Sequence, residues 1–455
     1  MKQWAHTIAV STVVAANIAS AEVNTEVVTL DQVIERALLN DPRISEQKKL
    51  VDVARTLLQE AQGSDDLIFG LDAFIGLTSK VEGGFFENNN SSNDPRSDRY
   101  EWNGLTTWTN LQLTIIKPLY TFGKIENYSD AAKSNIRVKE EDVRKQRADT
   151  IMDANRAYYG YLAARDTRYL FKDVIVRLNG AIKLVKRRLA DSESEDDIRQ
   201  SDLYALQAGK ALISKYLAQA AAIEKIAMAG LKVLTGGSLD DMLEVSDKRV
   251  TPVPLPDVAL DLLTQTALAK RPEMIQLEAG LQARRSLIAA RQAEKMPNVY
   301  AGIAALASYA PNRTRLDNPF IYDPFNDYGA TPLLGIKWNW ESGVHAARVA
   351  RAEAELAALV EKSTFAQRGI PFEVAEQYYQ VQGGYEAVQN LAQGSRAARR
   401  WMVSSYADFE AGIGDAEDSL TAFQGYVLVH SDYLSAVNDY NMNVARLRYV
   451  VGEYQ

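Results

Sequence analysis

The sequence predicts a mixed α and β membrane protein made of two homologous helix-strand-strand-helix halves. Three observations lead to this fold class. A series of short motifs occurs twice in the same order, two long segments contain almost no proline, and four short segments alternate apolar with polar or small residues.

Composition narrows the function further. The chain has 455 residues, 47% hydrophobic and 24% charged, which excludes a disordered chain, and its net charge of −8 argues against a nucleic-acid partner. Cysteine is absent, which excludes thiolate metal sites and cysteine nucleophiles. The three histidines are not spaced as ligands, and no catalytic or nucleotide-binding motif occurs. We therefore expect no enzyme activity, metal or cofactor.

The first 21 residues are typical of a secretory signal peptide. Lys2 precedes an apolar stretch that is too short to span a bilayer as a helix, and the segment ends in the A-x-A pattern Ala19-Ser20-Ala21. The mature chain is expected to start near Glu22. Nowhere later do 18 uninterrupted apolar residues occur, so any membrane span should be built from strands.

The repeated motifs divide the mature chain into a first repeat over 22–236, a proline-rich connector over 237–257 and a second repeat over 258–455. Ala37-Leu38-Leu39-Asn40-Asp41-Pro42 recurs as Ala267-Leu268-Ala269-Lys270-Arg271-Pro272. Ala157-Tyr158-Tyr159 is matched by Gln377-Tyr378-Tyr379, and Leu203-Tyr204-Ala205-Leu206-Gln207 by Leu420-Thr421-Ala422-Phe423-Gln424. Leu231 and Gly236 are matched by Leu447 and Gly452, and these four matches in one order indicate a duplication.

Proline placement predicts the helices. No proline occurs between residues 119 and 251, so we expect a long helix over about 123–190 and another over about 197–235. Their equivalents are 343–411 and 415–452, and each half should begin with one further long helix. Pro371 should kink the second long helix or leave a carbonyl without a donor.

Alternation predicts four strands, over about 67–79, 106–117, 297–309 and 330–341. Leu71 and Leu113 belong to the apolar face, whereas Gln112 belongs to the opposite face. Such segments are typical of outer-membrane barrels, although a half-buried soluble hairpin has the same local pattern. Four strands are too few for a closed barrel, so copies of the chain should share one, either as a dimer with eight strands or as a trimer with twelve.

These features together resemble the TolC-like outer membrane efflux protein (outer membrane factor) family. The resemblance rests on Thr29 to Ala37 leading into Asn40-Asp41-Pro42, on Pro118-Leu119-Tyr120-Thr121-Phe122-Gly123, and on the closing helix that ends in glycine. It implies a homotrimer with one 12-stranded transmembrane β-barrel, continued by a long periplasmic α-helical barrel. The second half has Trp338-Asn339-Trp340-Glu341-Ser342-Gly343 instead, and we expect Gly343 to preserve the turn made by Gly123.

The resemblance also implies a function and partners. The protein would reside in the bacterial outer membrane, in contact with its lipid, and conduct substrate passively as the exit duct of a tripartite efflux or type I secretion system. A periplasmic adaptor (membrane fusion protein) and an inner-membrane transporter would be its partners. The competing hypotheses are an outer-membrane-associated structural coiled-coil protein without transport and a periplasmic adaptor. A lipoyl-like domain, expected of an adaptor, is not visible in the sequence.

Candidate site residues lie at the two helix tips, near 191–200 and 409–418, which are both acidic. By resemblance the periplasmic aperture, or gate, involves Asp418, Thr421, Asp415 and Asp202, with Asp418 at the first of two family aspartate positions and Thr421 at the second. The adaptor-docking tips would contain Asp191, Asp197, Phe409 and Gly412. The alternative is an ordinary solvated acidic turn, with acidic residues that favour helix N-termini.

Overall fold

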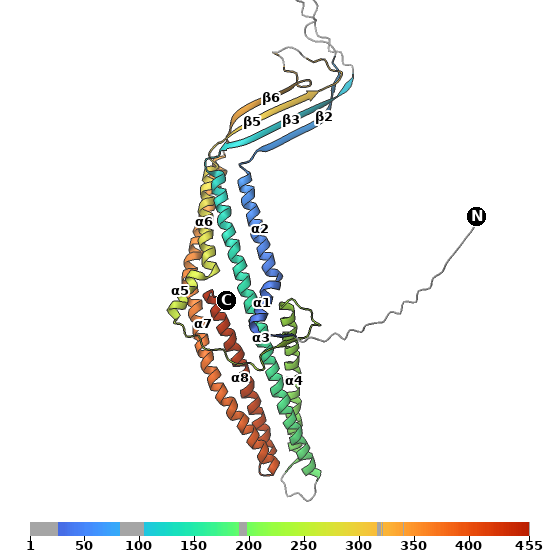
Figure 1. Cartoon of the computed structure of the whole chain (residues 1–455), viewed down its shortest axis with the longest axis vertical. Helices are drawn as coiled ribbons and strands as arrows, with labels where there is room; N and C mark the ends of the chain where they lie inside the picture. The colour runs from blue at the N-terminus through green and yellow to red at the C-terminus, as the bar shows by residue number, and fades with distance from the viewer. Residues whose placement is uncertain are drawn as a thin grey trace, which may run out of the picture. The chain divides into compact units, whose positions relative to one another are not determined.

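The computed structural model describes residues 26–81, 104–190, 198–315, 320, 322–339 and 341–454. The predicted signal peptide and most of the segment between the first two long strands lie outside the described residues. The two halves repeat one order of elements, two helices, two strands and two helices (Figure 1). The predicted fold class of mixed α and β with two homologous halves is therefore confirmed.

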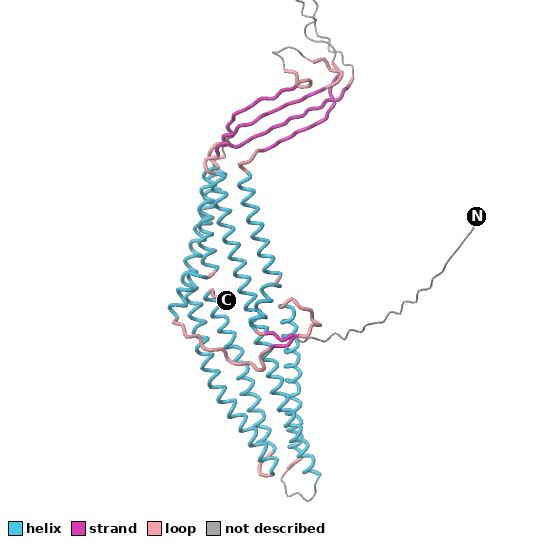
Figure 2. The backbone as a smooth tube through the Cα atoms, in the orientation of Figure 1, coloured by secondary structure: helices cyan, strands magenta, loops and turns pink. Residues whose placement is uncertain are grey.

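The bounds of the elements follow this repeat. The first half contains α1 (Leu30–Asn40), α2 (Pro42–Gly63), β2 (Ile68–Ser79), β3 (Leu105–Tyr120), α3 (Lys124–Ala190) and α4 (Gln200–Leu234). The second contains α5 (Leu260–Lys270), α6 (Pro272–Ala293), β5 (Asn298–Tyr309), β6 (Tyr328–Lys337), α7 (Ser342–Ala411) and α8 (Ala416–Val451). Two short strands, β1 (Glu26–Val28) and β4 (Leu243–Val245), pair in parallel and were not predicted (Figure 2).

Each half begins with a broken helix, so the expectation of one continuous helix there is wrong. The break falls at Asp41 before Pro42 and at Arg271 before Pro272, where the backbone is extended with ψ of 113° and 133°. A proline has no N–H to continue the helix, and its ring disfavours the helical conformation for the residue before it. The repeated Pro motif is therefore a helix break, with proline opening the next helix.

Pro371 behaves differently, because α7 is continuous through it. A proline inside a helix removes one backbone donor, so one carbonyl in the preceding turn is left without its helical hydrogen bond. The turn at the start of α7 also differs from its equivalent. Phe122 and Gly123 have φ of +56° and +80° ahead of α3, whereas Gly343 has no positive φ and lies inside α7, so the expected common geometry is wrong.

The chain divides into two compact units, and the larger strands belong to the one formed by residues 42–149, 256–381 and 446–455. In this unit β2, β3, β5 and β6 form one antiparallel sheet in that order (Figure 1). β6 ends at Lys337, four residues earlier than predicted, and Trp340 lies outside the described residues. Strands β2 and β6 are the two edges of the sheet.

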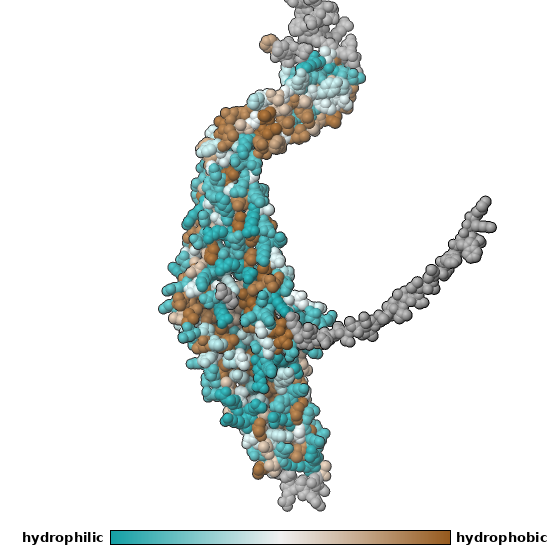
Figure 3. Space-filling model, in the orientation of Figure 1, coloured by the Kyte–Doolittle hydropathy of each residue, from teal (hydrophilic) through white to brown (hydrophobic). Residues whose placement is uncertain are grey.

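The register of the sheet separates an apolar face from a mixed one. Leu71 pairs with Leu113, and Leu113 with Ala305, while on the opposite face Asp72 pairs with Gln112. Exposed large side chains cover the apolar face, and hydrophobic residues gather over the sheet in Figure 3; they include Phe69, Leu71, Ile75, Leu77, Leu111, Ile303, Leu334 and Ile336. No described helix has a stretch long and apolar enough to cross a membrane.

The other compact unit contains residues 150–255 and 382–445 together with the chain up to Asp41. Here the connector after β4 is fixed to two helices. Tyr158 donates to the Asp247 carboxylate at 2.9 Å, the N–H of Val250 donates to Asp166 at 2.8 Å, and the N–H of Val253 donates to Asn441 at 2.9 Å. The connector is therefore an ordered strand-like segment whose backbone groups find side-chain partners.

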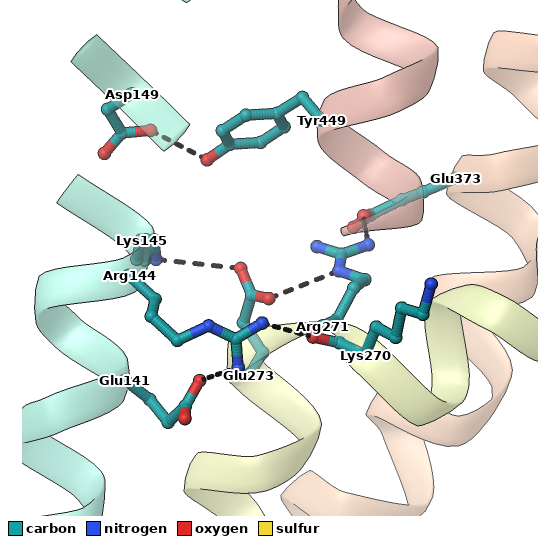
Figure 4. A network of polar contacts seen from close by, with 9 residues as sticks. All are labelled: Glu141, Arg144, Lys145, Asp149, Lys270, Arg271, Glu273, Glu373 and Tyr449. Atoms are coloured by element: carbon teal, nitrogen blue, oxygen red, sulfur yellow. Dashed lines mark hydrogen bonds and ion pairs between the residues drawn. The ribbon is translucent and has the colours of Figure 1, made fainter. Parts of the chain in front are cut away.

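The second helix break is the centre of a polar network (Figure 4). Arg271, only 7% exposed, donates to Glu373 on α7 at 2.6 Å and to Glu273 on α6 at 3.2 Å. At the equivalent first break, the Thr150 hydroxyl donates to Asp41 at 2.6 Å. Burial by itself would raise the pKa of Glu273, but the hydrogen bond and charge of Arg271 outweigh it and hold that pKa below its ordinary value.

Because its folded-state pKa is lowered, Glu273 stabilises the fold above its unfolded-state pKa, and this contribution is lost as pH falls through the folded-state pKa. In the Glu273→Gln variant, we expect the urea midpoint to fall less steeply between about pH 5 and 3 than in the natural chain. The measurement is far-ultraviolet circular dichroism in detergent. The control is Glu278→Gln, which changes an exposed carboxylate on the same helix. Identical acid sensitivity of Glu273→Gln and the natural chain would contradict this account.

Candidate functional site

The turn between α7 and α8 is closed by backbone hydrogen bonds around a left-handed glycine. Gly412 has φ of +80°, its N–H donates to the carbonyl of Phe409 at 3.2 Å, and the N–H of Ile413 donates to the carbonyl of Asp408 at 3.0 Å. This pair of bonds is the Schellman arrangement, which satisfies carbonyls at a helix end. A residue with a Cβ would be strained at this φ, so the turn requires glycine.

Arg188, in the last turn of α3, joins that helix to the α7–α8 turn. Its Nη2 donates to the carbonyl of Glu410 at 3.0 Å, and its guanidinium carbon lies 5.6 Å from the centre of the Phe409 ring. The Phe409 side chain is fully buried. It therefore supports the turn from inside, and contacts with another molecule would have to use its exposed neighbours.

Next to this turn, a single apolar cluster joins α3, α4, α7 and α8. The helices approach closely at two glycines: a Cβ added at Gly180 would lie 2.5 Å from the Tyr406 hydroxyl, and one at Gly209 would lie 2.7 Å from Leu420. The cluster contains Leu170, Phe171, Val174, Leu178, Leu203, Leu206, Ile213, Met402, Phe409, Phe423 and Tyr426, among others. Small residues at the contacts let the helix backbones come together.

The acidic residues of the second tip lie on the exposed side of this structure. Asp415 precedes α8, and Asp418 lies in its first turn; both are exposed. Among the described residues the Asp418 carboxylate has no hydrogen bond or ion pair. The helix dipole favours a negative charge in the first turn of α8. Thr421 is also exposed, and its hydroxyl donates to the carbonyl of Glu417 in the same helix at 2.9 Å.

The residues predicted at the first tip are only partly described. Asp202 lies in the first turn of α4 and accepts the N–H of Arg199 at 2.8 Å, so one of its oxygens caps the helix. Asp191 and Asp197 lie outside the described residues. No contact within the described part of the chain links Asp202 to Asp415 or Asp418. The structure therefore brings together Phe409, Gly412 and Arg188, but not the acidic groups.

Arg188 was missed by the sequence analysis. Its signal was available, because Arg187 and Arg188 end the long helix, where positive charge complements the helix dipole and can reach carbonyls. The sequence analysis considered the acidic residues of the tips and did not consider these arginines. In the described part of the chain, no group of three or more His, Asp or Glu residues could hold a metal ion.

Comparison with known proteins places the fold. The chain is similar in structure to the Campylobacter jejuni CmeC outer membrane channel, with 14% sequence identity and a TM-score of 0.75. The match covers 93% of this chain and 85% of CmeC. Similarity to the Vibrio cholerae outer membrane protein VceC has 16% identity, a TM-score of 0.71, and coverage of 93% and 96% of the two chains. The Neisseria gonorrhoeae MtrE outer membrane channel has 16% sequence identity and a TM-score of 0.69, and the match covers 93% of this chain and 88% of MtrE.

A family match places the sequence. No curated protein matches the chain. Residues 263–453, which span α5 to α8, match the family model described as outer membrane efflux protein. This match confirms the predicted resemblance over the second half of the chain. The second half thus matches the outer membrane efflux protein model, and the first half repeats its order of elements.

Proposed function

We propose that the chain is a passive exit duct of a tripartite efflux or type I secretion system. The observation that carries this proposal is the four-stranded sheet, which has an exposed apolar face and two unpaired edges. An apolar face of this kind suits contact with lipid, and the mixed opposite face suits a water-filled lumen. The long helices provide the wall of a duct outside the membrane.

Trimerisation follows from the edges. Unpaired strand edges are excluded from the hydrocarbon region, so β2 and β6 each need a partner. Adjacent strands are antiparallel throughout the sheet, so β6 of one copy can pair antiparallel with β2 of the next. Repetition of that contact closes a ring. Three copies give a barrel of twelve strands with room for a channel, whereas eight strands would leave an interior filled by side chains.

The energy for transport must come from partner proteins. The sequence contains no nucleotide-binding motif, which supports a passive duct driven by an inner-membrane transporter through a periplasmic adaptor. We place adaptor docking at the tips, on the exposed surface around Gly412 and on the acidic segment that contains Asp191 and Asp197. Phe409 contributes by holding the turn in shape.

We place the gate at the same end of the helices. Three copies of Asp418 around one axis would repel one another unless a cation lies between them, which would give the aperture a preference for cations. Asp415 and Asp202 add negative charge nearby, and Thr421 forms hydrogen bonds without adding charge. The exposure of the Asp418 carboxylate, which has no partner among the described residues, supports this proposal.

A structural coiled-coil protein without transport is the second candidate. A coiled-coil protein does not need strands, so this candidate does not account for the exposed apolar face of the sheet. Conductance in a planar bilayer separates the two candidates, because only a duct conducts ions.

The first prediction of the proposal is a trimer. The edges of β2 and β6 can be satisfied in lipid only by neighbouring copies. Native mass spectrometry of the detergent-purified protein should therefore give three copies of the mature chain. A monomer that stays in solution after detergent removal would contradict the trimer.

The second prediction concerns the lipid face. Leu113→Arg should destabilise the inserted trimer by about 2–4 kcal/mol if the residue lies near the bilayer midplane. Gln112→Arg, one residue away on the lumen side, is the matched control and should change stability little. Trimer survival during heating in detergent measures both. Equal damage from the two variants would mean that the face assignment is wrong.

The third prediction concerns the gate. Asp418→Ala should weaken block of the conductance by divalent and trivalent cations, because the aperture loses three carboxylates. Trimer stability should not change, since the side chain is exposed and unpaired among the described residues. Asp432→Ala, which removes an exposed carboxylate farther along α8, is the control. Unchanged cation block in Asp418→Ala would move the gate to Asp415 or Asp202.

A further inference from the structure

The described residues between β5 and β6 lie over the mixed face of the sheet. We use the name lumen strap for residues 310–315 and 322–327. The Ser308 hydroxyl donates to the carbonyl of Pro324 at 2.7 Å, and the Thr106 hydroxyl also donates to the strap, at the carbonyl of Pro311. Within the strap, Asn326 accepts the N–H of Ala310 at 2.9 Å and donates to the carbonyl of Arg313 at 3.1 Å.

An aromatic stack fastens the strap to the sheet. The ring of Phe325 lies 5.4 Å from that of Trp108 on β3, and Trp108 lies 5.4 Å from Phe74 on β2, both in edge arrangements. The guanidinium carbon of Arg313 lies 3.9 Å from the centre of the Phe325 ring. Edge-to-face aromatic pairs and cation–π contacts of this geometry are both attractive.

The strap also reaches across the sheet. It starts from the end of β5, and Arg313 donates to the carbonyl and hydroxyl of Ser79 on β2 at 3.1 and 3.2 Å. The N–H of Thr314 donates to the carbonyl of Val81 at 2.9 Å. Since β3 lies between β2 and β5, the strap crosses β3 near the loop end of the sheet.

Burial shows that the strap covers the mixed face. Thr106, Asn110 and Ser308 are polar residues of that face, and they are 6%, 6% and 7% exposed. Gln112, the next residue of β3 on the same face after Asn110, is exposed. The apolar face carries the residues suited to lipid, so the covered face is the one that would line the lumen.

We propose that the lumen strap lies inside the barrel and limits the size of molecules that pass its outer end, with Arg313, Phe325 and Trp108 as its latch. This inference rests on the proposed duct. In a trimer, three straps around one axis would narrow the lumen together. The latch makes the restriction stable, because opening it would separate the Phe325 ring from Trp108 and break the hydrogen bonds from Arg313 to Ser79 in each copy.

The absence of cysteine allows a clean test. Gln112→Cys places a single thiol on the lumen face beyond the strap, and intact cells are treated from outside with a small charged maleimide or a bulky polymer-linked one. The small reagent should label Gln112→Cys, and the bulky one should react slowly. Adding Phe325→Ala or Arg313→Gln should raise the bulky rate about five- to tenfold, which corresponds to the loss of one such contact.

Three controls separate the outcomes. Phe325→Tyr keeps the ring and should keep the slow rate, and Tyr322→Ala removes an exposed aromatic side chain of the strap and should change nothing. Leu113→Cys should react with neither reagent from the lipid face. Equal bulky labelling in the natural and latch backgrounds would overturn the strap as a barrier. Labelling of Leu113→Cys but not Gln112→Cys by the small reagent would overturn the proposed duct itself.

Discussion

Two unpaired strand edges are the constraint on which the architecture depends. β6 has ten residues, and roughly half of the backbone groups on an edge strand point away from its only neighbour. Each group left unsatisfied in hydrocarbon costs several kcal/mol. Their sum exceeds the roughly 5–15 kcal/mol of net stability that a folded domain possesses. A single copy inserted in lipid would therefore be unstable, and the even, antiparallel strand order is what lets identical copies satisfy one another.

Duplication repeated the backbone but not the side-chain chemistry. Both initial helices break before a proline, because the ring disfavours a helical conformation for the residue ahead of it. At the first break, Asp41 accepts a hydrogen bond from the Thr150 hydroxyl, whereas at the second, Arg271 pairs with two glutamates. A buried side chain must find partners at each break, yet either sign of charge can do so. The break is thus set by local backbone sterics, while its longer-range partners, Thr150 and Glu373, come from α3 and α7.

The sequence was sufficient for features that depend on periodicity or on single residues. Alternation identified the faces of Leu113 and Gln112, and proline-free stretches identified the long helices. The prediction failed at the two helix breaks, whose signal is local, and at contacts between distant segments. The helix breaks were overlooked because the Pro motif was used only as a repeat marker, although its local meaning was available. The contact of Arg313 with Ser79 joins residues 234 positions apart, and no local pattern encodes such a pairing.

The contacts at the helix tips differ in the free energy that a movement of the helices would cost. Separating α7 and α8 from α3 and α4 would expose Phe409, Met402 and the rest of the apolar cluster, at about 1.5–3 kcal/mol for each large side chain. Breaking the hydrogen bond from Arg188 to the carbonyl of Glu410 costs about 1.5–3 kcal/mol, because a charged donor binds a carbonyl there. Packed helices can slide by small amounts while retaining most of their buried area. Sliding would therefore cost less free energy than separation, because it can keep the apolar cluster buried.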